Sequence, residues 1–321
     1  MRAVLKLAVM FAGLAVVTAC QAQAWPTKPI RLVHGFGAGS AVDISARIMT
    51  APMAEMLGQQ FVVDPRPGVG GTMAARIVAK AEPDGYTQYL MISGHVVAAS
   101  LYRKLPYDTV RDFAAIALMA STPFVIAVAE PGPIRTIADL VRVAREQPGK
   151  LDYATGGIGT GTHLAAALMQ SRLGVQFNHV PYRGGNTALA LTSGEVQLIV
   201  GTPAGVMGFA SAGRIRLLAV TTAKRLPVWP EVPTVGETVL PNFEASGWFM
   251  LAAPRGLPPA IAARMHEATV AALRRPEVVE RLLATGTVVT LAPPRDAAAF
   301  LAGETARWAK VVRDESIPPQ D

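Results

Sequence analysis

The chain has 321 residues, of which 51% are apolar and 17% charged, and its formal net charge at pH 7 is +7. That length and apolar content suffice for two domains, each with its own core. The basic residues form no run of five or six, which argues against a nucleic-acid interface, and the single cysteine, Cys20, excludes a disulfide within the chain.

Residues 1–24 have the pattern of a signal peptide. Arg2 and Lys6 precede an apolar stretch at 7–17, and small residues lie before Trp25. We therefore predict export and cleavage before Trp25, which would leave no cysteine for a thiolate nucleophile or metal site. Residues 17–20 also resemble a bacterial lipobox, in which Cys20 would be acylated. No later segment is predicted to span a membrane.

Short β-rich runs alternate with helical periodicity along the rest of the chain. We predict strands at 30–33, 61–64, 86–93, 124–128, 151–154, 177–180, 198–200, 215–220 and 249–252. We predict helices at 41–57, 138–145, 163–173, 188–193, 259–274 and 276–283. The alternation predicts an α/β fold with largely parallel sheets.

Connecting segments rich in proline or glycine suggest how the chain divides. They lie around 130–133 and 225–233, and the chain is expected to return afterwards to the first domain. We predict a signal peptide at 1–24, a discontinuous first domain at 25–127 plus 247–321, and a second domain at 128–246. A ligand would then bind between the domains, at the carboxyl ends of the strands.

Two glycine-rich loops are predicted to join a strand to a helix. The first contains Gly37 and Gly39, and the second lies at 153–163. Backbone N–H groups at a helix start lack intrahelical partners and lie at the positive end of the helix dipole, so they can hold a carboxylate or phosphate. The alternative for the glycines is a tight turn with no ligand. Two such loops suggest an anionic ligand held from both sides.

Several phrases in unbroken order resemble a known family. They are WPTKPI at 25–30, RPGVGG at 66–71, AKAEPDGYT at 79–87, KLPYD at 104–108, HVPYRGG at 179–185 and VPTVG at 232–236. From Trp25 to about Arg313 the chain is similar to the Bug family, the periplasmic receptors of tripartite tricarboxylate transporters. The resemblance implies a type II, Venus-flytrap periplasmic binding protein with two α/β domains. It also implies a monomer that closes on a small carboxylate, partly through ordered waters, and delivers it to membrane permease subunits.

The resemblance also implies which residues hold the ligand. In the first loop these are Phe36, Gly37, Gly39, Ser40 and Asp43. In the second they are Thr155, Gly157, Gly159, Thr160, Gly161, Thr162 and His163, and His95 is expected in a strand-end loop lining the cleft. Ser40 and Thr160 could instead be helix caps, Asp43 could complement the helix dipole, and His163 fits a structural role better than a catalytic one.

One departure from the family pattern bears on the ligand. Many relatives have an acidic residue after the strand ending at Val200, where this chain has Gly201 and Thr202. A ligand ammonium would have no partner there. We therefore expect a dicarboxylate, a keto acid or an aromatic carboxylate, with Gly201 and Thr202 among the contacts.

The strongest alternative is an NAD-dependent oxidoreductase that uses the Gly35–Gly39 loop. Asp64 at the end of the next strand imitates the dinucleotide fingerprint, but no third glycine lies at the required spacing. A secreted hydrolase is a further alternative, but this chain has no Gly-x-Ser-x-Gly elbow for a serine nucleophile. Its five histidines also show no metal-ligand spacing. We expect a binding protein without cofactor, metal or catalytic residues.

Overall fold

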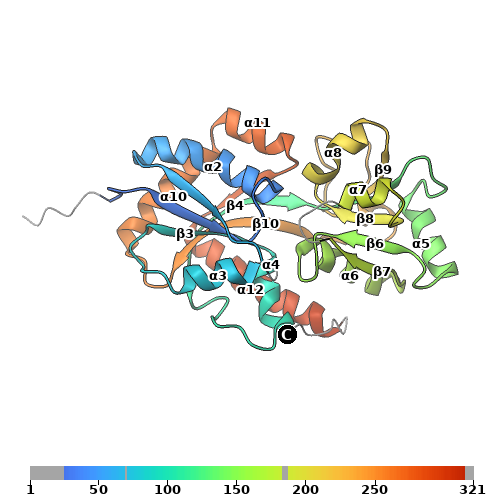
Figure 1. The fold of residues 1–321 in the computed structure, drawn as a ribbon, viewed down its shortest axis with the longest axis horizontal. Coiled ribbons are helices and arrows are strands. Elements are labelled where there is room, and N and C mark those ends of the chain that lie inside the picture. Colours follow the sequence, from blue (N-terminus) through green and yellow to red (C-terminus); the bar gives the residue numbers. More distant parts are fainter. Residues whose placement is uncertain (1–24, 69–70, 183–186, 315–321) are drawn as a thin grey trace, which may run out of the picture.

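A computed structural model describes residues 25–68, 71–182 and 187–314. Its strands form two separate sheets that lie side by side (Figure 1). The predicted signal peptide with Cys20 lies outside the described residues.

The first sheet has six strands in the order β11-β4-β10-β3-β1-β2. In the direction of the chain these are β1 (Ile30–His34), β2 (Phe61–Pro65), β3 (Thr87–Ile92), β4 (Phe113–Pro123), β10 (Ser246–Pro254) and β11 (Val288–Ala292). Strand β1 pairs in parallel with β2 and β3, whereas β10 is antiparallel to β3 and β4, and β11 is antiparallel to β4.

The second sheet has five strands in the order β7-β6-β8-β5-β9. They are β5 (Val125–Ala129), β6 (Asp152–Thr155), β7 (Asn178–Pro181), β8 (Leu198–Gly201) and β9 (Ile215–Val220). Strand β6 pairs in parallel with β7 and β8, but β5 is antiparallel to β8 and β9. The prediction of largely parallel sheets is therefore wrong. Parallel pairs come from strand–helix–strand units, whereas β5, β10 and β11 run against their neighbours and form the antiparallel pairs.

Helices cover both faces of the first sheet (Figure 1). Buried side chains of α2, α10 and α11 pack on one face, and those of α3, α4 and α12 pack on the other. These helices are α2 (Ala41–Leu57), α3 (Thr72–Ala79), α4 (Gly94–Leu101), α10 (Pro259–Leu273), α11 (Pro276–Ala284) and α12 (Pro294–Asp314). Successive residues of β3 point to opposite faces, as alternation along a strand requires. Leu90 packs with α2, α10 and α11, and Met91 packs with α3, α4 and α12.

The second sheet is covered in the same way. Helices α5 and α6 pack on one face, and α7 and α8 on the other. The helices are α5 (Ile137–Glu146), α6 (Gly161–Leu173), α7 (Thr187–Thr192), α8 (Pro203–Ser211) and the short α9 (Val235–Thr238). We call the first sheet with its helices the first lobe and the second sheet with its helices the second lobe.

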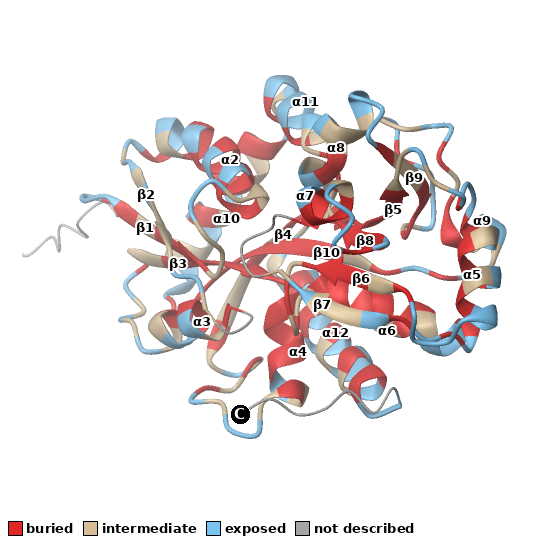
Figure 2. Ribbon diagram, turned by 45° about the vertical axis from the view of Figure 1, so that its right-hand side comes forward, coloured by how far each residue is buried: buried red, intermediate tan, exposed pale blue. Residues whose placement is uncertain are grey.

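The chain crosses between the lobes at two points. It passes from β4 to β5 at Phe124, and returns to β10 through residues 221–245. Thr221 joins the two crossings, because its hydroxyl accepts a hydrogen bond from Phe124 N–H (3.1 Å) and donates to Ala245 O. One core contains buried side chains of both lobes, and buried residues run along β4 and β10 into the second lobe (Figure 2). The lobes thus share a continuous interior around the crossings.

Candidate functional site

The two glycine-rich loops have the same local construction. Each follows a parallel strand, β1 or β6, and ends at a glycine in the left-handed region, Gly39 (φ 76°) or Gly159 (φ 77°). The next residue caps the helix: Ser40 Oγ accepts from Asp43 N–H at 3.3 Å, and Thr160 Oγ1 accepts from His163 N–H at 3.4 Å. Ser40 and Thr160 are therefore helix caps, the alternative that the sequence had left open.

In both loops the side chain three residues after the cap reaches back to the left-handed glycine. Asp43 Oδ2 accepts from Gly39 N–H at 3.1 Å, and His163 Nδ1 accepts from Gly159 N–H at 3.4 Å. An imidazole nitrogen that accepts a hydrogen bond carries no proton, so this contact assigns the His163 proton to Nε2. Asp43 and His163 thus hold the shape of their own loops.

Asp43 lies at the centre of a buried network. Its Oδ1 is 3.1 Å from His34 Nε2, and Arg47 Nε donates to its Oδ2 at 3.0 Å. Burial acts to raise the pKa of Asp43, but the hydrogen bonds from Arg47, Gly39 and His34 outweigh it and hold that pKa below its usual value. The carboxylate is therefore ionised and occupied by protein donors, and its predicted contact with a ligand stays a prediction.

Neutral side chains support the second loop. Thr155 Oγ1 lies 2.7 Å from His179 Nε2 and accepts from Gly157 N–H at 3.2 Å. The rings of His163 and His179 stack with their centroids 4.3 Å apart. Burial is the main cause that lowers the pKa of His163 to about 4 and the pKa of His179 to about 4. Both imidazoles are uncharged at neutral pH.

This difference makes the two helix starts electrostatically unequal. At α2 the Asp43 carboxylate offsets the positive end of the helix dipole, and Arg47 in turn pairs with that carboxylate. At α6 the corresponding side chain, His163, is neutral, and the first-turn N–H groups of Gly161 and Thr162 have no intrahelical acceptor. The start of α6 is therefore the better place for a ligand anion.

Close contacts place the second loop against the first lobe. A Cβ atom added at Gly159 would lie 2.9 Å from Leu101 Cδ2, and one added at Gly161 would lie 2.7 Å from Ser93 Oγ. Ser93 follows β3, whose carboxyl end lies beside that of β1 in the sheet. The second loop therefore lies at the carboxyl ends of the first-sheet strands, where the first loop also lies.

The remaining predicted residues have different surroundings. Phe36 packs partly on the core of the first lobe, and Gly37 has open space around it. Gly201 is the buried last residue of β8, and Thr202 precedes α8 without capping it through its side chain. Their predicted ligand contacts stay predictions.

His95 does not lie in a loop, so that part of its prediction is wrong. It is the second residue of α4 and is 2% exposed. Its Nε2 lies 2.8 Å from Thr109 O, and its ring stacks on Tyr107. Burial lowers the pKa of His95 to about 4. Helix α4 begins at Gly94, directly after Ser93, and the His95 imidazole lies in a cluster of aromatic rings.

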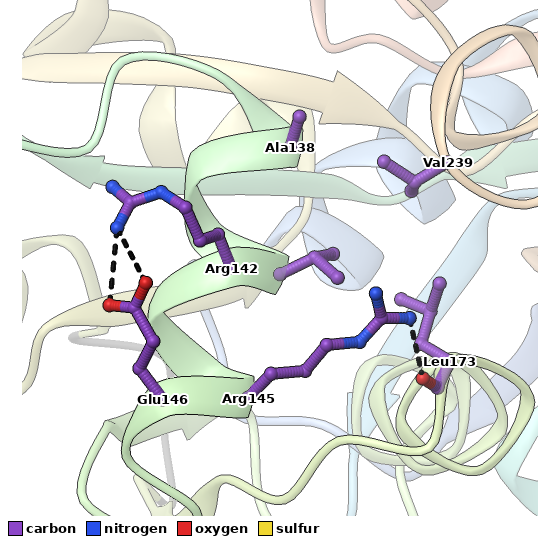
Figure 3. A pocket seen from close by; sticks show the side chains of 7 residues that line it. Ala138, Arg142, Arg145, Glu146, Leu173 and Val239 are labelled. Carbon is purple, nitrogen blue, oxygen red and sulfur yellow. Dashed lines mark hydrogen bonds and ion pairs between the residues drawn. The ribbon is translucent and has the colours of Figure 1, made fainter.

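Two surface hollows lie away from both loops. One lies between α5, α6 and α9, where Arg145 donates to Leu173 O (3.2 Å) and Arg142 pairs with Glu146 (Figure 3). The other borders it near Gln170 and Asp314. Surface ion pairs such as Arg142–Glu146 contribute little free energy, and nothing in these hollows adds a chemical function.

Among the described residues, no group of three or more His, Cys, Asp or Glu side chains could hold a metal ion. No helix in the described ranges is long and apolar enough to cross a membrane.

Comparison with known sequences shows the family. Residues 45–317 match the model of the tripartite tricarboxylate transporter family receptor, TctC. The chain belongs to this receptor family. A relative encoded in the tcbD–tcbE intergenic region of Pseudomonas sp. strain P51 is 40% identical over 291 residues, which cover 90% of this chain and 87% of that protein.

Solved structures of similar proteins have the same fold. The periplasmic binding protein BugD is 30% identical, with a TM-score of 0.85 over 92% of this chain and 100% of its own. Rpa4515 of R. palustris with adipate is 34% identical, with a TM-score of 0.87 over 92% and 100%. MatC of Rhodopseudomonas palustris with bound malate is 32% identical, with a TM-score of 0.82 over 90% and 100%. The predicted periplasmic binding protein fold and the resemblance to Bug receptors are thereby confirmed.

Proposed function

We propose that this protein is a periplasmic receptor that captures a small dicarboxylate between its two lobes. The observation that carries the proposal is the uncompensated start of α6, where free N–H groups meet the carboxyl edge of the first sheet. Two similar proteins were solved with adipate and with malate, which are both dicarboxylates. The neutral histidine at the second loop keeps this place free of competing negative charge.

In this proposal the two lobes act as the two closing domains, joined at Phe124 and through residues 221–245. The ligand contacts are the residues of the two loops, together with Gly201 and Thr202. Closure is favoured to the extent that the ligand binds the closed state more tightly than the open one. The loaded monomer would then pass its ligand to permease subunits of a tripartite transporter. Membership of this receptor family gives no support to the oxidoreductase alternative. That alternative is tested by including NAD among the ligands.

The decisive experiment changes the charge at position 163 while keeping the shape. In H163N the amide oxygen can accept from Gly159 N–H, as Asp43 does from Gly39 N–H in the first loop. In H163D the same geometry carries a negative charge. A unit charge about 5 Å from a carboxylate costs about 3 kcal/mol at an effective dielectric constant near 20, or about a hundredfold in affinity.

Protein spanning residues 25–321 would be unfolded and refolded to remove carried-over ligand, then titrated calorimetrically with adipate, malate, hexanoate and NAD. We expect wild type and H163N to bind a dicarboxylate with similar affinity and H163D to bind it at least tenfold more weakly. Binding of NAD without any carboxylate would refute the proposal. Equal affinities of H163N and H163D would refute the role of the α6 start.

A further inference from the structure

Ser93 is a buried residue whose hydroxyl makes no hydrogen bond to another described residue. It lies between β3 and α4 and is 5% exposed. Its backbone is already helical (φ −53°, ψ −30°), and its side chain does not cap α4. Its Oγ is not among the fully enclosed polar atoms that lack a partner, unlike that of Ser45, so the hydroxyl is free to donate to a group that enters from solvent.

The Ser93 hydroxyl points at the start of α6. Its Oγ would lie 2.7 Å from a Cβ atom built on Gly161, the first residue of that helix. The N–H groups of Gly161 and Thr162 have no intrahelical acceptor there. Ser93 also precedes the free first-turn N–H groups of α4. The hydroxyl of one lobe and the helix start of the other therefore border the same space.

We propose that Ser93 is a ligand contact that determines affinity for carboxylates, which deepens the function proposed above and rests on it. Its O–H donates a hydrogen bond to a carboxylate oxygen held at the start of α6. An ionised carboxylate only accepts hydrogen bonds, and the N–H groups and this hydroxyl supply donors from opposite sides. The ligand then joins the β3–α4 junction of the first lobe to α6 of the second, so the contact exists only when the lobes are together.

The test compares S93A with a matched control, S45A. Ser45 is a buried residue of α2, 1% exposed, and its Oγ also lacks a partner. It belongs to a different helix and does not face the start of α6. Affinities for adipate and malate would be measured by calorimetry, and the unfolding midpoints of the ligand-free proteins by urea titration.

We expect S93A to weaken dicarboxylate binding about tenfold or more, the usual size for losing a hydrogen bond to a charged group. Its ligand-free midpoint should equal that of wild type, because the Ser93 side chain makes no capping hydrogen bond that alanine would remove. S45A should bind like wild type. If wild type binds a dicarboxylate and S93A binds it equally well, the assignment of Ser93 is wrong while the proposed function stands. If wild type binds no carboxylate, the proposed function and this assignment both fail.

Discussion

The contact between Gly161 and the first lobe predicts a clear effect of one added methyl group. In G161A the new Cβ would lie 2.6 Å from Phe124 Cζ and 2.7 Å from Ser93 Oγ, well inside van der Waals contact. The Phe124 ring is 4% exposed, and a Cβ at Gly247 would lie only 3.2 Å from the same Cζ atom. The ring is therefore held between two glycines and cannot move aside.

The size of the effect follows from two opposing terms. Overpacking a close-packed interior costs about 1–3 kcal/mol. Alanine gains at most about 1 kcal/mol over glycine in a helix, and less at a first position such as 161. We therefore expect G161A to lose about 1–2 kcal/mol of unfolding free energy, seen as a lower urea midpoint with an unchanged slope.

The matched control is G303A in α12, where the space around the added Cβ is open. We expect this exposed helix position to gain up to about 1 kcal/mol. Because the contact at Gly161 joins the lobes, G161A should also weaken dicarboxylate binding, while G303A should leave it unchanged. A G161A protein as stable as G303A, with wild-type affinity, would show that the lobes do not meet as described.

Two further predictions concern the crossings and the second loop. In T221V the N–H of Phe124 and the carbonyl of Ala245 lose their buried partner, which should cost about 1–3 kcal/mol in a urea titration; a loss below about 0.5 kcal/mol would contradict the hydrogen bonds. The second concerns His163 and His179, whose pKa values of about 4 lie below the unfolded value near 6.5. Between these values the unfolded state binds more protons, so stability falls as pH falls from about 6.5 towards 4, and we expect to lose about 2 kcal/mol for each imidazole, or roughly 4 kcal/mol for the pair, between pH 7 and pH 5. Carboxylates with lowered pKa lose their contribution only below about pH 4. Identical urea midpoints for wild type at pH 7 and pH 5 would contradict this, and H179N should reduce the pH dependence.

Elements with a strong local pattern could be predicted from the sequence. Helix α2 has the predicted bounds, Ala41–Leu57, because an amphipathic period ends at Gly58 in the left-handed region. Strand β9, Ile215–Val220, also has its predicted bounds. By contrast, β4 was missed because its alanine-rich sequence lacks the β-branched residues that indicate strands. The 21-residue α12 was missed as well. Its buried residues pack on the first sheet, which also contains β4.

In the candidate site, too, the local features could be predicted and the contacts between distant residues could not. The loops and their caps follow from a strand, glycines and a hydroxyl residue before a helix. The contact of Ser93 with Gly161 joins residues that are far apart along the chain, and no local pattern records it. The signal that could have indicated Ser93 is a hydroxyl residue at the carboxyl end of the predicted strand 86–93. The antiparallel direction of β10 depends in the same way on distant pairing.

Glycines on both sides of the crossings explain how one ligand contact can favour closure. Gly161 touches the first lobe at Ser93, while a Cβ at Gly286 would lie 2.2 Å from Pro203 Cβ in the second lobe. Figure 1 shows α8 and α11 on one side of the crossing strands and α4 and α6 on the other. A rotation about those strands that opened the α4–α6 side would press Gly286 against the Pro203 ring, and a close-packed contact yields little. In the proposed site, a carboxylate bound by Ser93 and the start of α6 lies on that side, so its hydrogen bonds would add free energy to the closed arrangement alone, which is the differential affinity that ligand-driven closure requires.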